Sequence, residues 1–240
     1  MAGHSKWSNI KRKKAKTDSQ RAKIFTKIGR EISLAVREAG TDPNTNGKLR
    51  EMIAKAKSLN VPGDNIERAI KKAGTDKAEY ERILYEGYGP QGAALIVECL
   101  TDNRNRTAGD LRHYFDKYGG NLGQTGSVGF LFERKGVLAL ENNGLDEAGV
   151  MEDCLEAGAL DFSFEEDMAE IITPADSVHT VREAMEKKGY RFAVSQAEYV
   201  PSACVKLDGE NAARMEKLLE MLEDNDDVQE VWHNWDDTAV

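Results

Sequence analysis

The chain has 240 residues, of which 40% are apolar and 31% are charged, and its length suits two or three globular domains. The longest apolar run, Ala93 to Val97, is too short to cross a bilayer, and no apolar segment follows the basic N-terminus, so the sequence predicts neither a membrane protein nor a secreted one. Three cysteines without C-x-x-C spacing favour a reducing compartment, and we expect a cytoplasmic protein.

Charge is divided unequally between the two ends of the chain. Residues 1–77 contain 19 Lys and Arg against 8 Asp and Glu, a net charge of +11, whereas the rest of the chain contains 14 against 34, a net charge of −20. A basic module joined to an acidic body is typical of proteins that bind a polyanion at one end only. The sequence therefore predicts a nucleic-acid partner for the N-terminal module.

A basic arm precedes three predicted helices. Residues 1–16 hold six Lys and Arg with few large apolar side chains, so the arm cannot bury enough surface to fold alone. Apolar residues then recur at helical spacing over Arg21 to Ala39, Asn46 to Leu59 and Asn65 to Ala73. We expect these amphipathic helices to form one small bundle, which together with the arm makes a domain over residues 1–78.

From residue 79 onward, predicted strands and helices alternate. Residues 137–200 follow the order β-α-β-β-α-β, the split βαβ pattern, and the flanking pieces follow it again when they are joined. The predicted strands are Ala93 to Thr101, Ser127 to Phe132, Val137 to Leu140, Asp161 to Phe164, Ala169 to Thr173, Arg191 to Val200, Ala203 to Leu207 and Val228 to His233; the predicted helices begin at Thr107, Leu145, Asp176 and Glu210.

This order predicts an α+β multidomain fold, in which the three-helix bundle is followed by two ferredoxin-like α/β domains. One α/β domain, residues 135–201, is inserted in the other, which is discontinuous and consists of residues 79–134 and 202–240. Two α/β domains in simple sequence are the alternative.

No motif indicates catalysis or a bound cofactor. The glycine-rich run 119–127 lacks the order of a P-loop and leads from a helix into a strand, so glycines with positive φ in a connector are favoured over a phosphate cradle. The histidines and cysteines share no spacing that suits a metal ion. We therefore predict a non-enzymatic protein with no metal, no cofactor and no small-molecule substrate.

The cations of the first predicted helix fall on one face. Four of them stand at positions i, i+4, i+7 and i+14, away from the apolar face, so the helix can pack and present charge together. The first 30 residues hold ten cations and a single acidic residue, more positive charge than solubility requires. The predicted nucleic-acid-binding residues are His4, Lys6, Trp7, Lys11, Arg12, Lys13, Lys14, Lys16, Lys23, Lys27, Arg30 and Arg37.

Trp7 has two interpretations of equal weight. An exposed indole among cations can stack on an unpaired RNA base, or it can anchor the arm against the helical bundle. Small polar neighbours such as His4 suit contacts with phosphate or sugar.

The chain resembles the YebC family along nearly its whole length. The strings that carry the resemblance are Ala2 to Trp7, Lys23 to Lys27, Tyr85 to Pro90, Asp102 to Thr107, Gly119 to Gly123 and Asp226 to Val231. The resemblance implies a three-domain cytoplasmic protein with a helical N-terminal domain and two α/β domains. Members are described as probable transcriptional regulators, a mitochondrial relative as a translational activator, and bacterial members as acting on ribosomes stalled at consecutive prolines.

RNA is favoured over duplex DNA as the partner. The second and third helices would suit a helix-turn-helix, but the third begins with Asp64, Asn65 and Glu67, and the carboxylates of Asp64 and Glu67 would meet phosphates poorly. We therefore expect a translation factor that binds ribosomal RNA, with a promoter-binding transcriptional regulator as the alternative. An adaptor whose acidic body binds a basic protein is a third possibility. A second nucleic-acid contact is expected at Arg104, Arg106 and Asn121.

Overall fold

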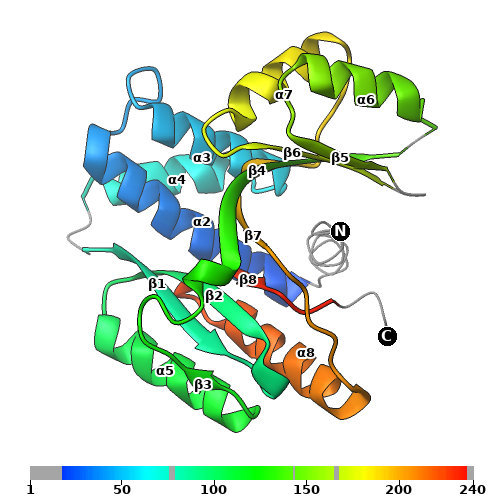
Figure 1. The fold of residues 1–240 in the computed structure, drawn as a ribbon. Coiled ribbons are helices and arrows are strands. Elements are labelled where there is room, and N and C mark those ends of the chain that lie inside the picture. Colours follow the sequence, from blue (N-terminus) through cyan, green and yellow to red (C-terminus); the bar gives the residue numbers. More distant parts are fainter. Residues whose placement is uncertain (1–17, 76–78, 143, 165–167, 237–240) are drawn as a thin grey trace. The chain divides into compact units, whose positions relative to one another are not determined.

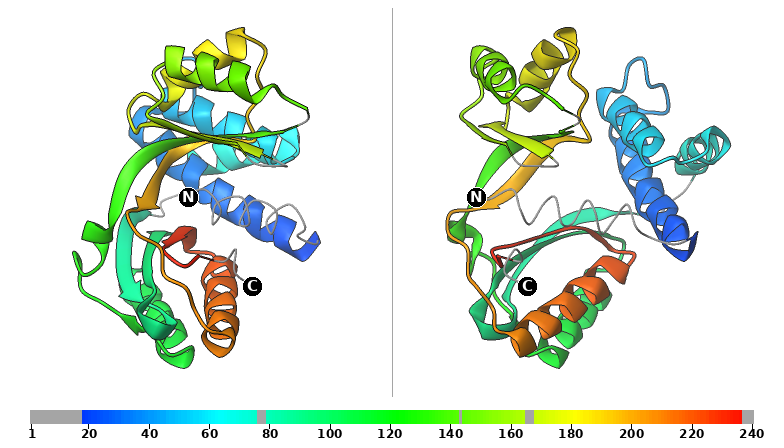
Figure 2. Two further views of the ribbon diagram at one scale, coloured as in Figure 1. Left: turned by 45° about the vertical axis from the view of Figure 1, so that its right-hand side comes forward. Right: turned by 90° about the vertical axis from the view of Figure 1, so that its right-hand side faces the viewer.

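A computed structural model describes residues 18–75, 79–142, 144–164 and 168–236, which are drawn in colour in Figures 1 and 2. The described residues form two compact units, and the chain is α+β, as predicted. The first unit contains residues 18–127 and 207–231; the second contains residues 128–206 and 232–236. Among the described helices, none has the length and hydropathy that crossing a membrane requires.

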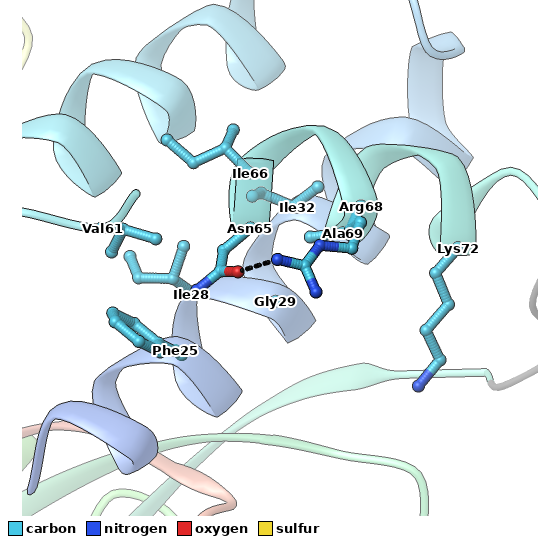
Figure 3. Close-up of a pocket in the computed structure, with 10 residues that line it drawn as sticks. All are labelled: Phe25, Ile28, Gly29, Ile32, Val61, Asn65, Ile66, Arg68, Ala69 and Lys72. Carbon is cyan, nitrogen blue, oxygen red and sulfur yellow. Dashed lines mark hydrogen bonds between the residues drawn. The ribbon is translucent and has the colours of Figure 1, made fainter. Parts of the chain in front are cut away.

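Three helices form the N-terminal bundle: α2 (Asp18–Ala39), α3 (Gly47–Ser58) and α4 (Gly63–Ala73). All three were predicted from apolar spacing. Their shared core includes the buried side chains of Ile32, Leu49, Ala56 and Ile66, and Figure 3 shows the side of the bundle where α2 and α4 meet. Asn46 fixes the turn between α2 and α3, because its side chain caps α3 at Leu49 N and donates to two backbone oxygens at the end of α2.

The first unit also contains a four-stranded sheet in the order β3-β1-β2-β8. Helices α5 and α8 cover one face of this sheet (Figure 2). The strands are β1 (Glu81–Tyr88), β2 (Ala94–Thr101), β3 (Asn121–Leu122) and β8 (Val228–His233), the helices are α5 (Arg104–Lys117) and α8 (Gly209–Asp224), and a 3₁₀ turn, η1 (Pro90–Gly92), joins β1 to β2.

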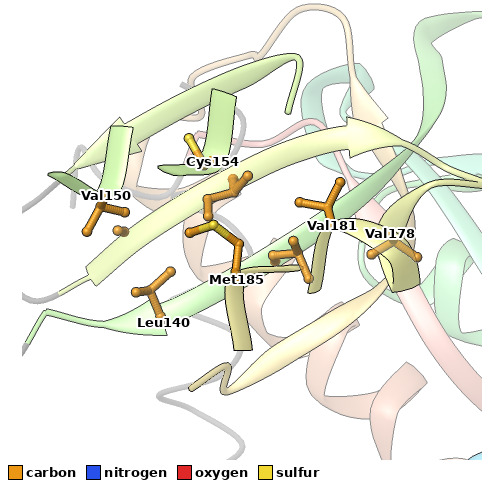
Figure 4. Close-up of a cluster of buried hydrophobic side chains, with 9 residues drawn as sticks. Leu140, Val150, Cys154, Val178, Val181 and Met185 are labelled. Carbon is orange, nitrogen blue, oxygen red and sulfur yellow. The ribbon is translucent and has the colours of Figure 1, made fainter. Parts of the chain in front are cut away.

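The second unit is a ferredoxin-like domain, as predicted. Its sheet has the order β5-β6-β4-β7, and all of its strand pairs are antiparallel. Leu140 of the sheet shares one buried core with Val150, Cys154 and Met185 of the helices (Figure 4). The strands are β4 (Phe132–Glu141), β5 (Asp161–Phe164), β6 (Met168–Pro174) and β7 (Val194–Pro201), and the helices are α6 (Glu147–Glu156) and α7 (Val178–Lys187).

In chain order, the second sheet is inserted between β3 and α8 of the first. The strands β3, β1, β2 and β8 of the first sheet correspond in spatial order to β5, β6, β4 and β7 of the second. The chain order differs at one strand, because β1 comes before the other strands of its sheet, whereas β6 comes after the first helix of its own. The domain boundaries after residues 78, 134 and 201 stay predictions.

Three predicted features of the discontinuous α/β domain, residues 79–134 and 202–240, are wrong. Ala203 to Leu207 forms no strand, only an isolated bridge between Val205 and Trp235, and its place in the sheet is taken by β1, which was not predicted. The strand predicted from Ser127 to Phe132 is a 3₁₀ turn, η2 (Gly129–Leu131), that leads into β4. Helix α5 begins before Thr107, because the side chain of Asn103 caps it at Arg106 N.

Candidate nucleic-acid interface

Most of the predicted interface lies outside the described residues. This part is the basic arm, with His4, Lys6, Trp7, Lys11, Arg12, Lys13, Lys14 and Lys16. The described part of the prediction consists of the four cations of α2.

Two of these cations cap the C-terminal end of α8. Lys23 Nζ donates to the backbone oxygen of Asp224 at 3.1 Å and forms an ion pair with its carboxylate, and Lys27 Nζ donates to the backbone oxygen of Glu223 at 2.7 Å. The last carbonyls of a helix have no partner within the helix and carry partial negative charge. Because α8 has no basic residue in its own last turn, Lys23 and Lys27 supply the favourable positive charge from α2.

A buried carboxylate, that of Asp227, joins α2 to α5. Only 4% of its side chain is exposed, and it accepts hydrogen bonds from Thr107 at 2.6 Å, from Arg106 at 2.9 Å and from Arg30. Burial raises the pKa of Asp227, but the hydrogen bonds from Thr107, Arg106 and Arg30 outweigh this effect, so the pKa lies below its ordinary value. The carboxylate is therefore held ionised between two guanidinium groups.

The charged face of α2 is therefore not open to solvent alone, because Lys23, Lys27 and Arg30 bind other parts of the first unit. The Arg30 side chain is only 15% exposed, and it also donates to the backbone oxygen of Asp226 at 2.7 Å. Arg37, in contrast, pairs with Glu79 at 2.7 Å where both side chains are well exposed. That these cations contact nucleic acid stays a prediction, but the structure gives them protein partners that lie up to 201 positions away in sequence.

Other cations of the bundle are exposed. Lys57 stands in the last turn of α3, and Lys71 and Lys72 stand in the last turn of α4. Within the described part of the chain, none of these three has a carboxylate partner. Positive charge at these positions also suits the helix dipoles, which favour cations near helix C-termini. These exposed cations make α3 and α4 the bundle's accessible basic surface.

The residues predicted as a second contact do not lie together. Arg104 and Arg106 stand in the first turn of α5, whereas Asn121 opens β3 beyond the other end of that helix. A helix of 14 residues is about 20 Å long. Arg104 and Asn121 are exposed, but Arg106 is engaged by Asp102 and Asp227, both at 2.9 Å. The geometry separates Asn121 from the two arginines.

Backbone conformation and close packing explain why glycine stands at three positions of the run 119–127. Gly119 and Gly126 adopt positive φ, +83° and +86°, which is the connector role predicted from the sequence. Gly120 is needed for a different reason, because a Cβ there would lie 2.3 Å from the backbone oxygen of Tyr88. The run packs closely against β1.

An apolar groove of about 220 Å³ runs between α2 and α4 (Figure 3). Its deepest lining is aliphatic, from the buried side chains of Ile28, Ile32, Val61 and Ile66. Helical spacing assigns Ile28, Ile32 and Ile66 to the bundle core, whereas Val61 lies between two predicted helices. The sequence does not reveal that a space stays open beside these residues. The ring of Phe25, which is partly buried, adds an aromatic surface to the groove.

Polar and cationic side chains lie at the groove's mouth. Arg68 Nη2 donates to Asn65 Oδ1 at 2.7 Å, and Lys72 follows one turn later on α4. The ten residues that line the groove include no carboxylate. An apolar space with a positively charged rim suits a ligand that is both partly apolar and anionic.

Two family models match the chain, one over each part. The model described as the TACO1/YebC protein N-terminal domain matches residues 5–76, and the model described as the TACO1/YebC second and third domain matches residues 80–235. The chain belongs to the TACO1/YebC family. The family resemblance that the sequence strings indicated is thereby confirmed.

Relatives of this TACO1/YebC chain match it over nearly its full length. It is 56% identical over 239 residues to a "probable transcriptional regulatory protein" of Finegoldia magna, with 98% of this chain and 99% of the relative covered. A protein of the same name from Caldicellulosiruptor bescii is 55% identical over 240 residues, with 99% of both chains covered. The crystal structure of a conserved hypothetical protein, Aq1575, from Aquifex aeolicus matches with a TM-score of 0.82 and 42% identity, over 92% of this chain and 93% of that one. The names of the curated relatives describe regulators of transcription and not enzymes.

Proposed function

We propose that the protein is a non-enzymatic regulator of gene expression that binds RNA through its N-terminal module. The observation that carries this proposal is the net charge of +11 on residues 1–77 beside −20 on the remainder. Cations that neutralise phosphates release bound counterions, which drives binding, and an acidic body confines the contact to the basic end. Because protein partners engage the cations of α2, the proposed surface consists mainly of the arm and the exposed cations of α3 and α4.

The beginning of α4 favours RNA over duplex DNA. In a helix-turn-helix built from α3 and α4, the first residues of α4 would face base edges and phosphates in the major groove. Asp64 stands in the first turn of α4 and Glu67 shortly after it, and both are exposed, so carboxylates would meet the duplex while Lys71 and Lys72 stand at the far end of the helix. Promoter DNA is the second candidate, because curated relatives are named as transcriptional regulators.

Within the RNA proposal, the expected partner is the ribosome in the cytoplasm. The family resemblance supports this step, since bacterial members are described as acting on ribosomes stalled at consecutive prolines. The proposed action is binding alone, with no cofactor, metal ion or small-molecule substrate.

The proposal is tested by fluorescence anisotropy with an RNA hairpin and with duplex DNA, each over a range of salt concentrations. We expect the RNA hairpin to bind more tightly, with an affinity that falls steeply as salt rises. The substitution Lys71→Glu should weaken binding several-fold and reduce the salt slope by about one. Its matched control is Lys187→Glu, the same charge reversal at an exposed position in the last turn of α7, which should leave the affinity unchanged.

Tighter binding to duplex DNA than to the hairpin would favour the promoter candidate. Equal losses in the Lys71→Glu and Lys187→Glu variants would mean that net charge alone, and not a surface on α4, determines the affinity.

A further inference from the structure

Gly29 stands inside α2, at a position where glycine weakens a helix relative to alanine. Its φ is not positive, and a Cβ added there would meet no atom within 4 Å, so neither backbone strain nor crowding by the described residues requires glycine. Gly29 lines the groove between α2 and α4. A glycine beside open space allows a group from outside to approach the helix backbone closely, and this suggests that the groove has an occupant.

The lining residues indicate the chemistry of that occupant. Phe25 provides an aromatic surface above an aliphatic floor, and Asn65 provides an amide with both donor and acceptor capacity. Arg68 and Lys72 stand at the mouth, and no carboxylate lines the groove. The occupant should therefore combine a flat apolar group, hydrogen-bonding edges and negative charge. A nucleotide combines all three in one unit, whereas an acidic peptide would have to supply the flat apolar group and the negative charge from separate residues.

We propose that the groove holds one unstacked base of a single-stranded RNA segment, with the adjoining phosphate at Arg68 and Lys72. This inference rests on the proposed function and adds a site to it. The base would lie against the ring of Phe25, since aromatic side chains provide stacking surfaces for bases of any kind. The backbone at Gly29 leaves room for the base, and the Asn65 amide faces its edge.

The test blocks the groove without disturbing the bundle. Gly29→Leu places a side chain in the open space, and Gly29→Ala is the matched control with a single methyl group. Both substitutions should leave thermal stability equal or higher, because Leu and Ala form helices better than Gly. The probe is an RNA hairpin with 2-aminopurine in its single-stranded loop, read by anisotropy for affinity and by 2-aminopurine fluorescence for stacking.

If the groove holds a base, the unsubstituted protein and the Gly29→Ala variant should bind the hairpin and change its 2-aminopurine fluorescence. Gly29→Leu should bind about tenfold more weakly and leave the fluorescence unchanged, and Phe25→Ala should also lose the fluorescence change. If Gly29→Leu binds as well as the unsubstituted protein does, the groove is not the site and only this inference fails. If the unsubstituted protein binds no RNA, the proposed function fails as well.

Two other occupants, an acidic peptide and the chain's own arm, are tested with Gly29→Leu and with a further variant, Trp7→Ala. If Gly29→Leu abolishes binding of an acidic peptide but leaves hairpin binding intact, the groove is a peptide site and the inference is wrong. If Trp7→Ala alone shifts the NMR signals of Phe25 and Gly29 in the absence of RNA, the occupant is the chain's own arm, and the inference is again wrong.

Discussion

At the scale of single residues, Asp227 has the most consequential environment in the first unit. Its carboxylate accepts from Arg30 of α2 and from Arg106 and Thr107 of α5, and it is almost fully buried. A buried charge of this kind is stable only while its partners remain, because removing one side of the pair leaves the other desolvated and unpaired. The helical bundle and the first sheet are therefore held together partly by electrostatics.

Replacing this charge should destabilise the first unit. Asp227→Asn removes the negative charge and leaves Arg30 without a counter-charge at a site where only 15% of its side chain is exposed. We expect the free energy of unfolding, measured in urea at neutral pH, to fall by about 3 kcal/mol. The control is Asp224→Asn, whose exposed pair with Lys23 should contribute less than about 1 kcal/mol. Equal effects of the two substitutions would contradict this account of Asp227.

The same carboxylate predicts a dependence on pH. Because the pKa of Asp227 is lower in the folded chain than in the unfolded chain, the unfolded chain takes up its proton first as the pH falls. Its stabilising contribution is therefore complete above the ordinary Asp pKa of about 3.9 and is lost as the pH falls through the lower, folded value. The gap in unfolding free energy between the unsubstituted protein and Asp227→Asn should be widest at neutral pH and narrow below about pH 4. A constant gap between pH 7 and pH 3 would contradict the lowered pKa.

At the scale of elements, the glycines next to β1 show how closely the chain packs there. Gly87 approaches Asn121 and Phe115, where a Cβ would lie 2.8 Å from each, and Gly120 approaches the backbone of Tyr88. No side chain fits at either position without a shift of the neighbouring backbone or ring.

Alanine substitutions distinguish glycines that leave no room for a Cβ from glycines beside open space. Gly120→Ala should lower the free energy of unfolding by about 2 kcal/mol, because the new methyl group overlaps a backbone oxygen. Gly109→Ala, in α5, meets no atom within 4 Å and should raise it by up to about 1 kcal/mol. Urea unfolding of the two variants compares them directly, and a stabilised Gly120→Ala protein would show that the loop does not pack on β1 as described.

Sequence patterns predicted the helices better than the strands. The three bundle helices and the β-α-β-β-α-β order of the second unit follow from apolar periodicity, which depends on local spacing alone. The sequence pattern did not predict strand β1, because the strand contains a buried charged residue, Glu86, and a glycine, Gly87, both of which are uncommon inside strands. The reason for that glycine is a contact with β3 and α5, which no local pattern reveals.

At the scale of the whole molecule, the uneven charge was predictable and the partners of the cations were not. The one-sided distribution of Lys23, Lys27 and Arg30 follows from helical spacing, but the groups they bind lie about two hundred residues later in the chain. Likewise, Ile28, Ile32 and Ile66 in the groove's floor follow from periodicity, whereas the open space beside Gly29 depends on how α2 and α4 pack.

Sedimentation can test whether the basic N-terminal module binds RNA on the ribosome. Cell lysate containing the full-length protein, or a variant lacking residues 1–16, is run through a sucrose gradient at low and at high salt. We expect the protein with residues 1–16 to travel with ribosomes at low salt and to leave them as salt rises, while the truncated variant stays at the top. A full-length protein that never enters the ribosomal fractions at low salt would contradict the claim and make promoter DNA the leading candidate.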